Sequence, residues 1–180
     1  MSSIASPVKA LDERHISAAA QNIAAAQFAL HGFDVLDQAG RARYSHDLGV
    51  ASTGGMMKIM VHASLKGLWG LIDPYLVKTK PHKGDLHRAI DLWHDRYRHS
   101  ACCLVQFDSS NLIGMPRIYL ASAAEVAELL HEKAETSGEM ARGSGAGGSG
   151  DSSGQEALPQ RWRLSQARIT ELMKCLPLMS

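Results

Sequence analysis

Apolar and polar residues alternate on both sides of a glycine pair in the first third of the chain. Alternation with a period of two is typical of a half-buried strand, and adjacent glycines favour a tight turn. Residues 44–67 therefore predict a β-hairpin. Its first strand contains Tyr44, Asp47, Leu48 and Val50, its turn Thr53, Gly54 and Gly55, and its second strand Met57, Ile59, Val61 and Ala63.

Three other segments have the pattern of helices. Residues 15–30 are rich in alanine and are followed by Gly32, which favours a helix stop. The segment after Gly84 and residues 123–133 carry apolar residues at helical spacing, opposite polar ones. The apolar positions are Leu86, Ile90, Trp93 and Tyr97 in the first of these, and Val126, Leu129 and Leu130 in the second.

Two apolar runs complete the predicted core. Residues 101–107 form one long run, as expected of a central strand covered on both faces, and residues 117–120 form a shorter one. Strands and helices in this order predict an α/β fold, with a central mixed sheet of about four or five strands flanked by helices. A chain of 180 residues is long enough for one such core and too short for two large ones.

The composition changes after residue 134. Residues 135–157 are dominated by glycine and serine, and they predict a flexible linker that cannot bury a core. We therefore divide the chain into a disordered lead (1–13), one α/β domain (14–134), this linker, and a C-terminal helical segment (158–180).

The C-terminal segment predicts a short helix with Ser165 as its N-cap. Its apolar stripe would be costly to leave in water, so we expect it to dock on its own domain, with a protein partner or a second copy as the alternative. Trp162 is the expected anchor because a large aromatic side chain buries the most surface. The stripe consists of Leu164, Ile169, Leu172 and Met173.

Overall composition is that of an ordinary globular protein, with 45% apolar and 21% charged residues and a net charge of +1. No run is long and apolar enough to cross a bilayer, and the first residues lack the apolar segment of a secretory signal. Cys102 and Cys103 lie in an apolar run, which favours buried free thiols over a disulfide. These features predict a cytoplasmic protein with no membrane partner.

Positive charge is concentrated in residues 78–99. This segment contains six lysines and arginines and four histidines, but only three aspartates. A local basic surface predicts contact with phosphates of DNA or RNA. The alternative is a solvated helix face with internal Asp–Arg pairs. The candidate nucleic-acid contacts are Lys78, Lys80, Lys83 and Arg88.

His87, Asp91 and His94 share one helical face in this segment, which raises the question of a zinc site. Structural zinc sites usually add cysteines or further ligands from another element. The segment has neither CxxC nor HExxH spacing, so we do not expect zinc there.

The order of these motifs resembles the PD-(D/E)XK nuclease superfamily, in particular its restriction-endonuclease-like and resolvase-like members. The resemblance spans residues 14–130 and a short terminal piece at 162–165. It rests on the alanine-rich helix, the extended Phe33-Asp34-Val35, the hairpin with its acidic residue, and the strand at 115–121 followed by a helix. The resemblance implies a restriction-endonuclease-like core.

The resemblance also implies a metal-dependent active site, which this sequence fills poorly. Asp47 matches the metal-binding aspartate and is the one candidate metal ligand, whereas Gln21 stands where many members have a helical glutamate. Met60 replaces a Glu, Asp or Gln, and His62 replaces the catalytic lysine. Magnesium prefers oxygen ligands, and the reaction needs a cation to stabilise phosphoryl charge. Efficient cleavage is therefore not expected.

Three functions remain open on these grounds. We favour a catalytically impaired PD-(D/E)XK nuclease-like domain that acts as a nucleic-acid-binding or assembly module and needs no cofactor. The second is an active metal-dependent endonuclease whose variant site uses Asp47 and His62 with magnesium or manganese. The third is a protein–protein interaction subunit. In the first and third, His62 is a half-buried strand histidine bonded to a neighbour.

Overall fold

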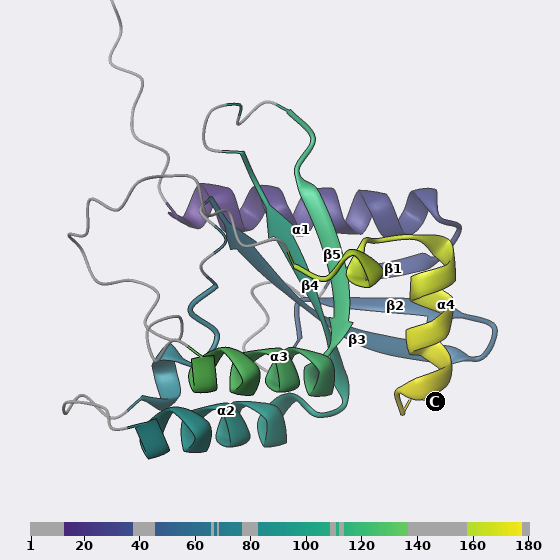
Figure 1. Ribbon diagram of the computed structural model, residues 1–180. Helices are drawn as coiled ribbons and strands as arrows, with labels where there is room; N and C mark the ends of the chain where they lie inside the picture. Colours follow the sequence, from purple (N-terminus) through teal and green to yellow (C-terminus); the bar gives the residue numbers. More distant parts are fainter. Residues whose placement is uncertain are drawn as a thin grey trace, which may run out of the picture.

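The computed structural model describes residues 13–37, 46–65, 67, 69–76, 83–108, 111, 114–136 and 158–177. These residues form an α/β fold whose five-stranded mixed sheet has the order β1-β2-β3-β4-β5 (Figure 1). Strands β3 and β4 are parallel, and the other neighbours are antiparallel. The strands are β1 (Asp34–Asp37), β2 (Leu48–Ser52), β3 (Gly55–Ser64), β4 (Ser100–Gln106) and β5 (Arg117–Ser122).

The predicted hairpin is β2 and β3. Ser52 pairs with Gly55, so Thr53 and Gly54 form the connecting turn, and the positive φ of +131° at Gly55 suits a residue without a Cβ. Strand β2 begins at Leu48, so Asp47, which the sequence placed within the strand, lies immediately before it. Tyr44, which the sequence also placed in this strand, lies outside the described residues.

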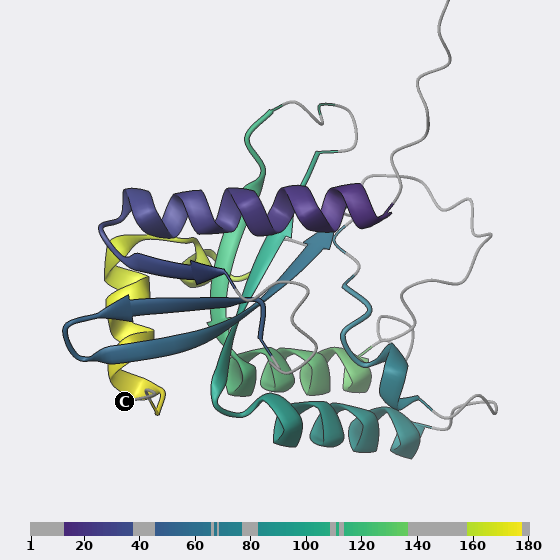
Figure 2. The same ribbon diagram turned by 180° about the vertical axis from the view of Figure 1, so that it is seen from behind.

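Helices cover the two faces of the sheet in separate layers, as Figures 1 and 2 show. Helix α1 (Glu13–Leu30) packs on one face through Ile16, Ala20, Ala24 and Phe28. Helix α2 (Lys83–Tyr97) connects the parallel strands β3 and β4, and it packs with α3 (Ala123–Thr136) on the opposite face. The sheet therefore separates the residues that contact α1 from those that contact α2 and α3.

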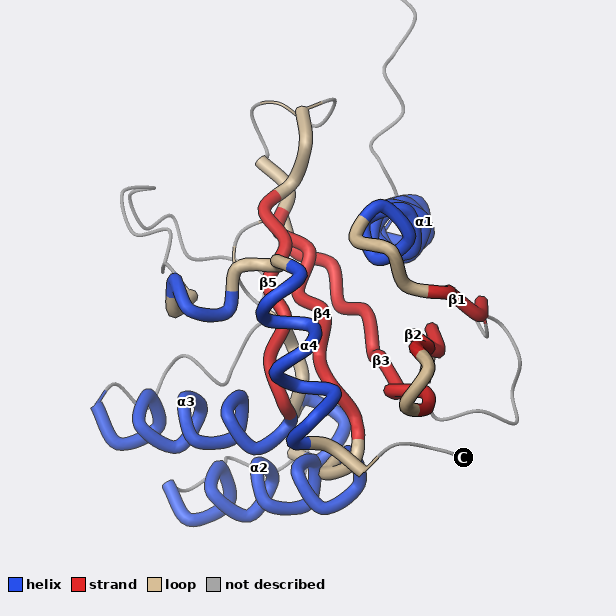
Figure 3. The backbone as a smooth tube through the Cα atoms, turned by 90° about the vertical axis from the view of Figure 1, so that its right-hand side faces the viewer, coloured by secondary structure: helices blue, strands red, loops and turns tan. Residues whose placement is uncertain are grey.

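The C-terminal segment wraps around the β5 edge of the sheet (Figure 3). The 3-10 turn η2 (Gln160–Trp162) contributes Trp162 to the core beneath α2 and α3. Arg163 then bridges to Tyr119 of β5, and α4 (Gln166–Cys175) packs with the α1 side of the core. This course covers a strand edge that would otherwise expose unpaired backbone groups.

Local sequence signals explain the ends of α4. The Ser165 side chain accepts a hydrogen bond from the Arg168 N–H at 3.2 Å, so Ser165 is the N-cap that the sequence predicts. Ile169, Leu172 and Met173 are buried, and Leu164 packs against the same core. Residues 1–12 of the predicted lead and 137–157 of the predicted linker lie outside the described residues, whereas Glu13 begins α1 and residues 135–136 belong to α3.

The cysteines follow their predicted state. Cys102 and Cys103 are buried free thiols on β4, and burial raises the pKa of Cys103 to about 12, so it stays protonated. Cys175 is a free, exposed thiol on α4. Within the described part of the chain, no helix is both long and apolar enough to cross a membrane.

Candidate functional site

Asp47 lies immediately before β2, where it meets β3 and α1. Its Oδ2 atom accepts a hydrogen bond from the Val61 backbone N–H at 2.8 Å, and its Oδ1 accepts one from the Gln21 side-chain amide at 3.2 Å. Burial raises the pKa of Asp47 above its ordinary value, and the Val61 N–H partly offsets that shift. The structure thus brings together Asp47 and Gln21, two of the four residues implied by the nuclease resemblance.

The Met60 side chain packs in the hydrophobic core. Its side chain is 4% exposed and belongs to the apolar cluster under α2 and α3, whereas Ile59 and Val61 on either side pack toward α1. Side chains alternate between the faces of a strand. The position where a second carboxylate would be required is therefore filled by a thioether in an apolar environment.

His62 follows two residues later on the same face of β3. The residue as a whole is half-buried, but its Nε2 atom is shielded from solvent and has no hydrogen-bond partner. Burial lowers the pKa of His62 to about 4. The ring is consequently neutral near pH 7, so it supplies no positive charge of the kind a catalytic lysine provides.

His46 adds a second buried histidine beside Asp47. Burial and the nearby Lys58 both lower the pKa of His46, while Asp47 opposes the shift. The Nε2 atom of His62 has no hydrogen-bond partner, so it does not bond to Asp47. The described residues also contain no group of three or more His, Cys, Asp or Glu side chains placed to hold a metal ion.

A further polar residue on the His62 face was not apparent from the sequence. Gln106 on β4 pairs with Ser64 on β3, is 2% exposed, and has a buried Nε2 atom without a hydrogen-bond partner. A side chain at Gly67 would lie 3.3 Å from that nitrogen. Nothing in the sequence singles out Gln106, because it lies within the apolar run 101–107, which predicts only a buried strand.

The basic segment is described only in part. Lys78 and Lys80 lie outside the described residues, and Lys83 begins α2 without a described side chain. Arg88 is exposed on α2, as a phosphate contact requires. Asp91, which the sequence could equally pair with an arginine, instead lies 3.1 Å from His131 on α3.

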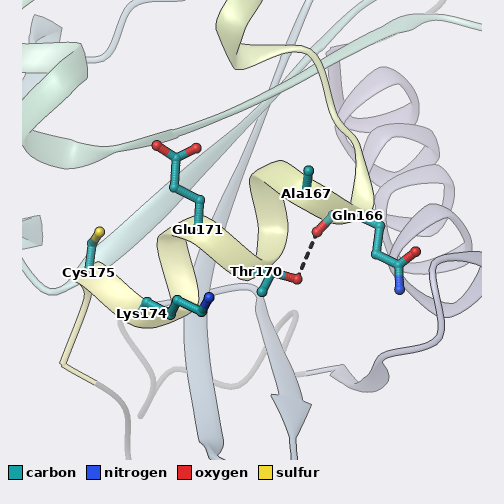
Figure 4. Close-up of a pocket in the computed structure, with 6 residues that line it drawn as sticks. All are labelled: Gln166, Ala167, Thr170, Glu171, Lys174 and Cys175. Carbon is teal, nitrogen blue, oxygen red and sulfur yellow. Dashed lines mark hydrogen bonds between the residues drawn. The ribbon is translucent and has the colours of Figure 1, made fainter.

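The outer face of α4 is hollowed (Figure 4). Thr170 there donates a hydrogen bond to the Gln166 carbonyl at 2.9 Å, so this hydroxyl is engaged within its own helix. The apolar stripe of α4 packs on its own domain, so the hollow lies on the other face of the helix. The hollow is lined by Gln166, Ala167, Thr170, Glu171, Lys174 and Cys175.

No family model, curated protein or solved structure matches this chain.

Proposed function

We propose that this protein is a nuclease-like module of the PD-(D/E)XK type that has lost efficient cleavage and acts in nucleic-acid binding or assembly. The order of elements supports a restriction-endonuclease-like core: a helix, three antiparallel strands, a crossover helix and a parallel fourth strand. Fold alone does not determine activity, so the proposal rests on the site.

The observation that carries the proposal is the separation of the catalytic positions. Asp47 bonds to Gln21 and the β3 backbone, while Met60 is buried in the core on the other side of the sheet. A magnesium ion would meet one carboxylate and a neutral amide, and such a ligand set is weak. His62 is neutral and shielded at the position where a cation would stabilise the transferred phosphoryl group.

Nucleic-acid binding would use the basic segment that begins α2. Exposed Arg88 belongs to this segment, and the preceding lysines extend it. Phosphate contacts carry no sequence information, so binding should be largely independent of sequence. It should also weaken as salt rises, because each neutralised phosphate releases counterions.

The test measures binding and cleavage on one preparation of the full chain. DNA and RNA oligonucleotides, single- and double-stranded, are titrated at several salt concentrations with and without magnesium or manganese. We expect salt-dependent binding and no metal-dependent cleavage above background. Cleavage that disappears in Asp47→Ala would overturn the noncatalytic assignment and establish the variant endonuclease.

Matched charge variants test the surface. Changing Lys78, Lys80, Lys83 and Arg88 to alanine should lower the slope of log affinity against log salt by about 0.7–0.9 for each phosphate that the variant no longer neutralises. The control removes the exposed charges of Arg161 and Lys174 in the C-terminal segment and should leave the slope unchanged. If the wild type binds no nucleic acid even at low salt, the assembly function alone stands.

A further inference from the structure

Two histidines from different helices meet at the boundary between α2 and α3. The Nδ1 atoms of His87 and His131 are 2.7 Å apart, and the rings are inclined by only 9°. The ring centroids are 4.9 Å apart, so the two nitrogens lie between the centroids and point toward each other nearly in the ring planes. A single proton shared between the nitrogens accounts for this distance.

Asp91 fixes which nitrogens carry protons. It lies one turn after His87 on α2, and its Oδ1 atom is 3.1 Å from Nε2 of His131. A carboxylate accepts but does not donate, so Nε2 of His131 carries a proton and donates it to Asp91. In a neutral ring Nδ1 of His131 is then an acceptor, and His87 must donate through its own Nδ1–H.

We propose that His87 and His131 form a proton-operated clasp between α2 and α3, closed while at least one ring is neutral and open when both are protonated. In the closed form the free acceptor of the pair is Nε2 of His87. A first added proton enters there and breaks neither bond. A second proton must occupy Nδ1 of His131, which removes the acceptor and places two N–H groups and two positive charges face to face.

Charged groups around the clasp favour the added positive charge. One turn from the two histidines, the described residues carry three carboxylates. Negative charge on these carboxylates opposes the repulsion between two imidazolium rings. These carboxylates are Asp91 on α2 and Glu128 and Glu135 on α3. Asp73 and Tyr75 belong to the 3-10 turn η1, which packs on α2.

Opening the clasp is a local event. Helices α2 and α3 also share an apolar cluster that includes Leu86, Ile90 and Ala127, and protonation does not affect these contacts. The clasp therefore controls the polar rim between the helices while the core holds them together. It lies beside Arg88, so its state changes the charge of the surface proposed above to contact phosphates.

Nuclear magnetic resonance of the full chain, labelled with 15N-histidine, tests the proposal directly. At about pH 7.5 we expect His87 as the Nδ1–H tautomer, His131 as the Nε2–H tautomer, and a scalar coupling between the two Nδ1 nuclei across the hydrogen bond. The coupling should disappear on acidification, when both rings titrate. Asp91→Ala should abolish the tautomer preference of His131, whereas Asp91→Asn, which can still accept, should keep it.

A double-mutant cycle with His87→Leu and His131→Leu gives a second measurement. The coupling free energy between the two sites should be present at about pH 7.5 and lost once acid has protonated both rings. Contributions of the other buried histidines cancel, because all four proteins of the cycle contain them. His94→Gln on the same helix is the control and should leave the coupling unchanged. The clasp is refuted if the two histidines show no coupling free energy at about pH 7.5, or if this coupling survives protonation of both rings. It is also refuted if one equivalent of zinc binds between the rings in place of the shared proton.

Discussion

The Val61 backbone N–H donates a hydrogen bond to the Asp47 carboxylate at 2.8 Å. The Asp47 backbone N–H in turn donates to the Ile59 carbonyl of β3 at 2.9 Å, so main chain and side chain both tie Asp47 to β3 just before β2 begins at Leu48. Asp47 is therefore held as a cap on the edge of β3, and its second oxygen is occupied by Gln21 of α1. Asp47, which the resemblance implies as a metal ligand, thus joins β3 to α1, and this structural role can be measured.

The first prediction separates the charge of Asp47 from its hydrogen bonds. Because the pKa of Asp47 is raised in the folded state, the folded chain holds this proton to a higher pH than the unfolded chain. The free energy of unfolding then declines as pH rises from about 3.9 through the raised pKa. Asp47→Asn should remove this decline and raise the melting temperature at pH 7, because its carbonyl still accepts from Val61 and the Gln21 amide can rotate.

Asp47→Ala is the matched comparison, because it removes both the charge and the acceptor. The Val61 N–H is then left without its partner, and an unsatisfied, partly buried donor costs about 1–3 kcal/mol. Denaturant unfolding at pH 7 measures both variants. Equal destabilisation by Asn and Ala would show that the charge of Asp47, and not its acceptor oxygen, stabilises the strand edge.

The second prediction concerns acid stability and His62. Its pKa of about 4 in the folded protein lies below the ordinary value, so the unfolded chain binds the proton more readily. Stability should therefore fall as pH drops from about 6.5 toward the folded-state pKa. His62→Leu should reduce the slope of unfolding free energy against pH in this window by up to about one proton. The exposed His15→Gln should leave the slope unchanged.

The elements of this fold were accessible from sequence because each has a local signal. Alternation around Gly54 predicts the hairpin, the alanine-rich stretch predicts α1, and Ser165 predicts the start of α4. The packing of Met60 was not accessible, because its side of β3 depends on which layer each helix covers. The pairing of His87 with His131 was missed for a similar reason. The sequence suggests His94 as the neighbour on one helix, and only the packing of α2 against α3 brings in His131.

The third prediction tests Trp162 as the anchor of the C-terminal segment. The side chain is 1% exposed, and its Nε1–H is buried without a hydrogen-bond partner. Trp162→Ala should cost about 3–5 kcal/mol, because it removes buried surface and leaves a cavity. Trp162→Phe keeps most of the apolar surface and removes the unsatisfied donor, so its cost should be much smaller. Similar losses of stability for both variants, measured by denaturant unfolding, would mean that Nε1 has a partner in solution.

The fourth prediction concerns Arg168, which ties α4 to two other elements. Its guanidinium is 6% exposed and forms ion pairs with Glu125 of α3 and, at 2.9 Å, with Glu171 of its own helix. Its Nε donates to the Leu120 carbonyl of β5 at 3.0 Å. Arg168→Met should destabilise the protein by about 3–5 kcal/mol, because a largely buried ion pair is deprived of one partner. Lysine cannot reproduce three directed contacts, so Arg168→Lys should also be destabilising.

Glu171→Gln and acid titration complete this test. Glu171 is 60% exposed, so its removal should cost about 1 kcal/mol or less. Burial opposes ionisation of Glu125, but the Ser122 N–H and Arg168 outweigh it and leave its pKa below the ordinary value. The stability from Glu125 should be complete above its ordinary pKa of about 4.3 and lost as pH falls through the lower folded-state value. Arg168→Met should weaken that acid dependence; if it persists unchanged, the Ser122 hydrogen bonds alone lower the pKa of Glu125.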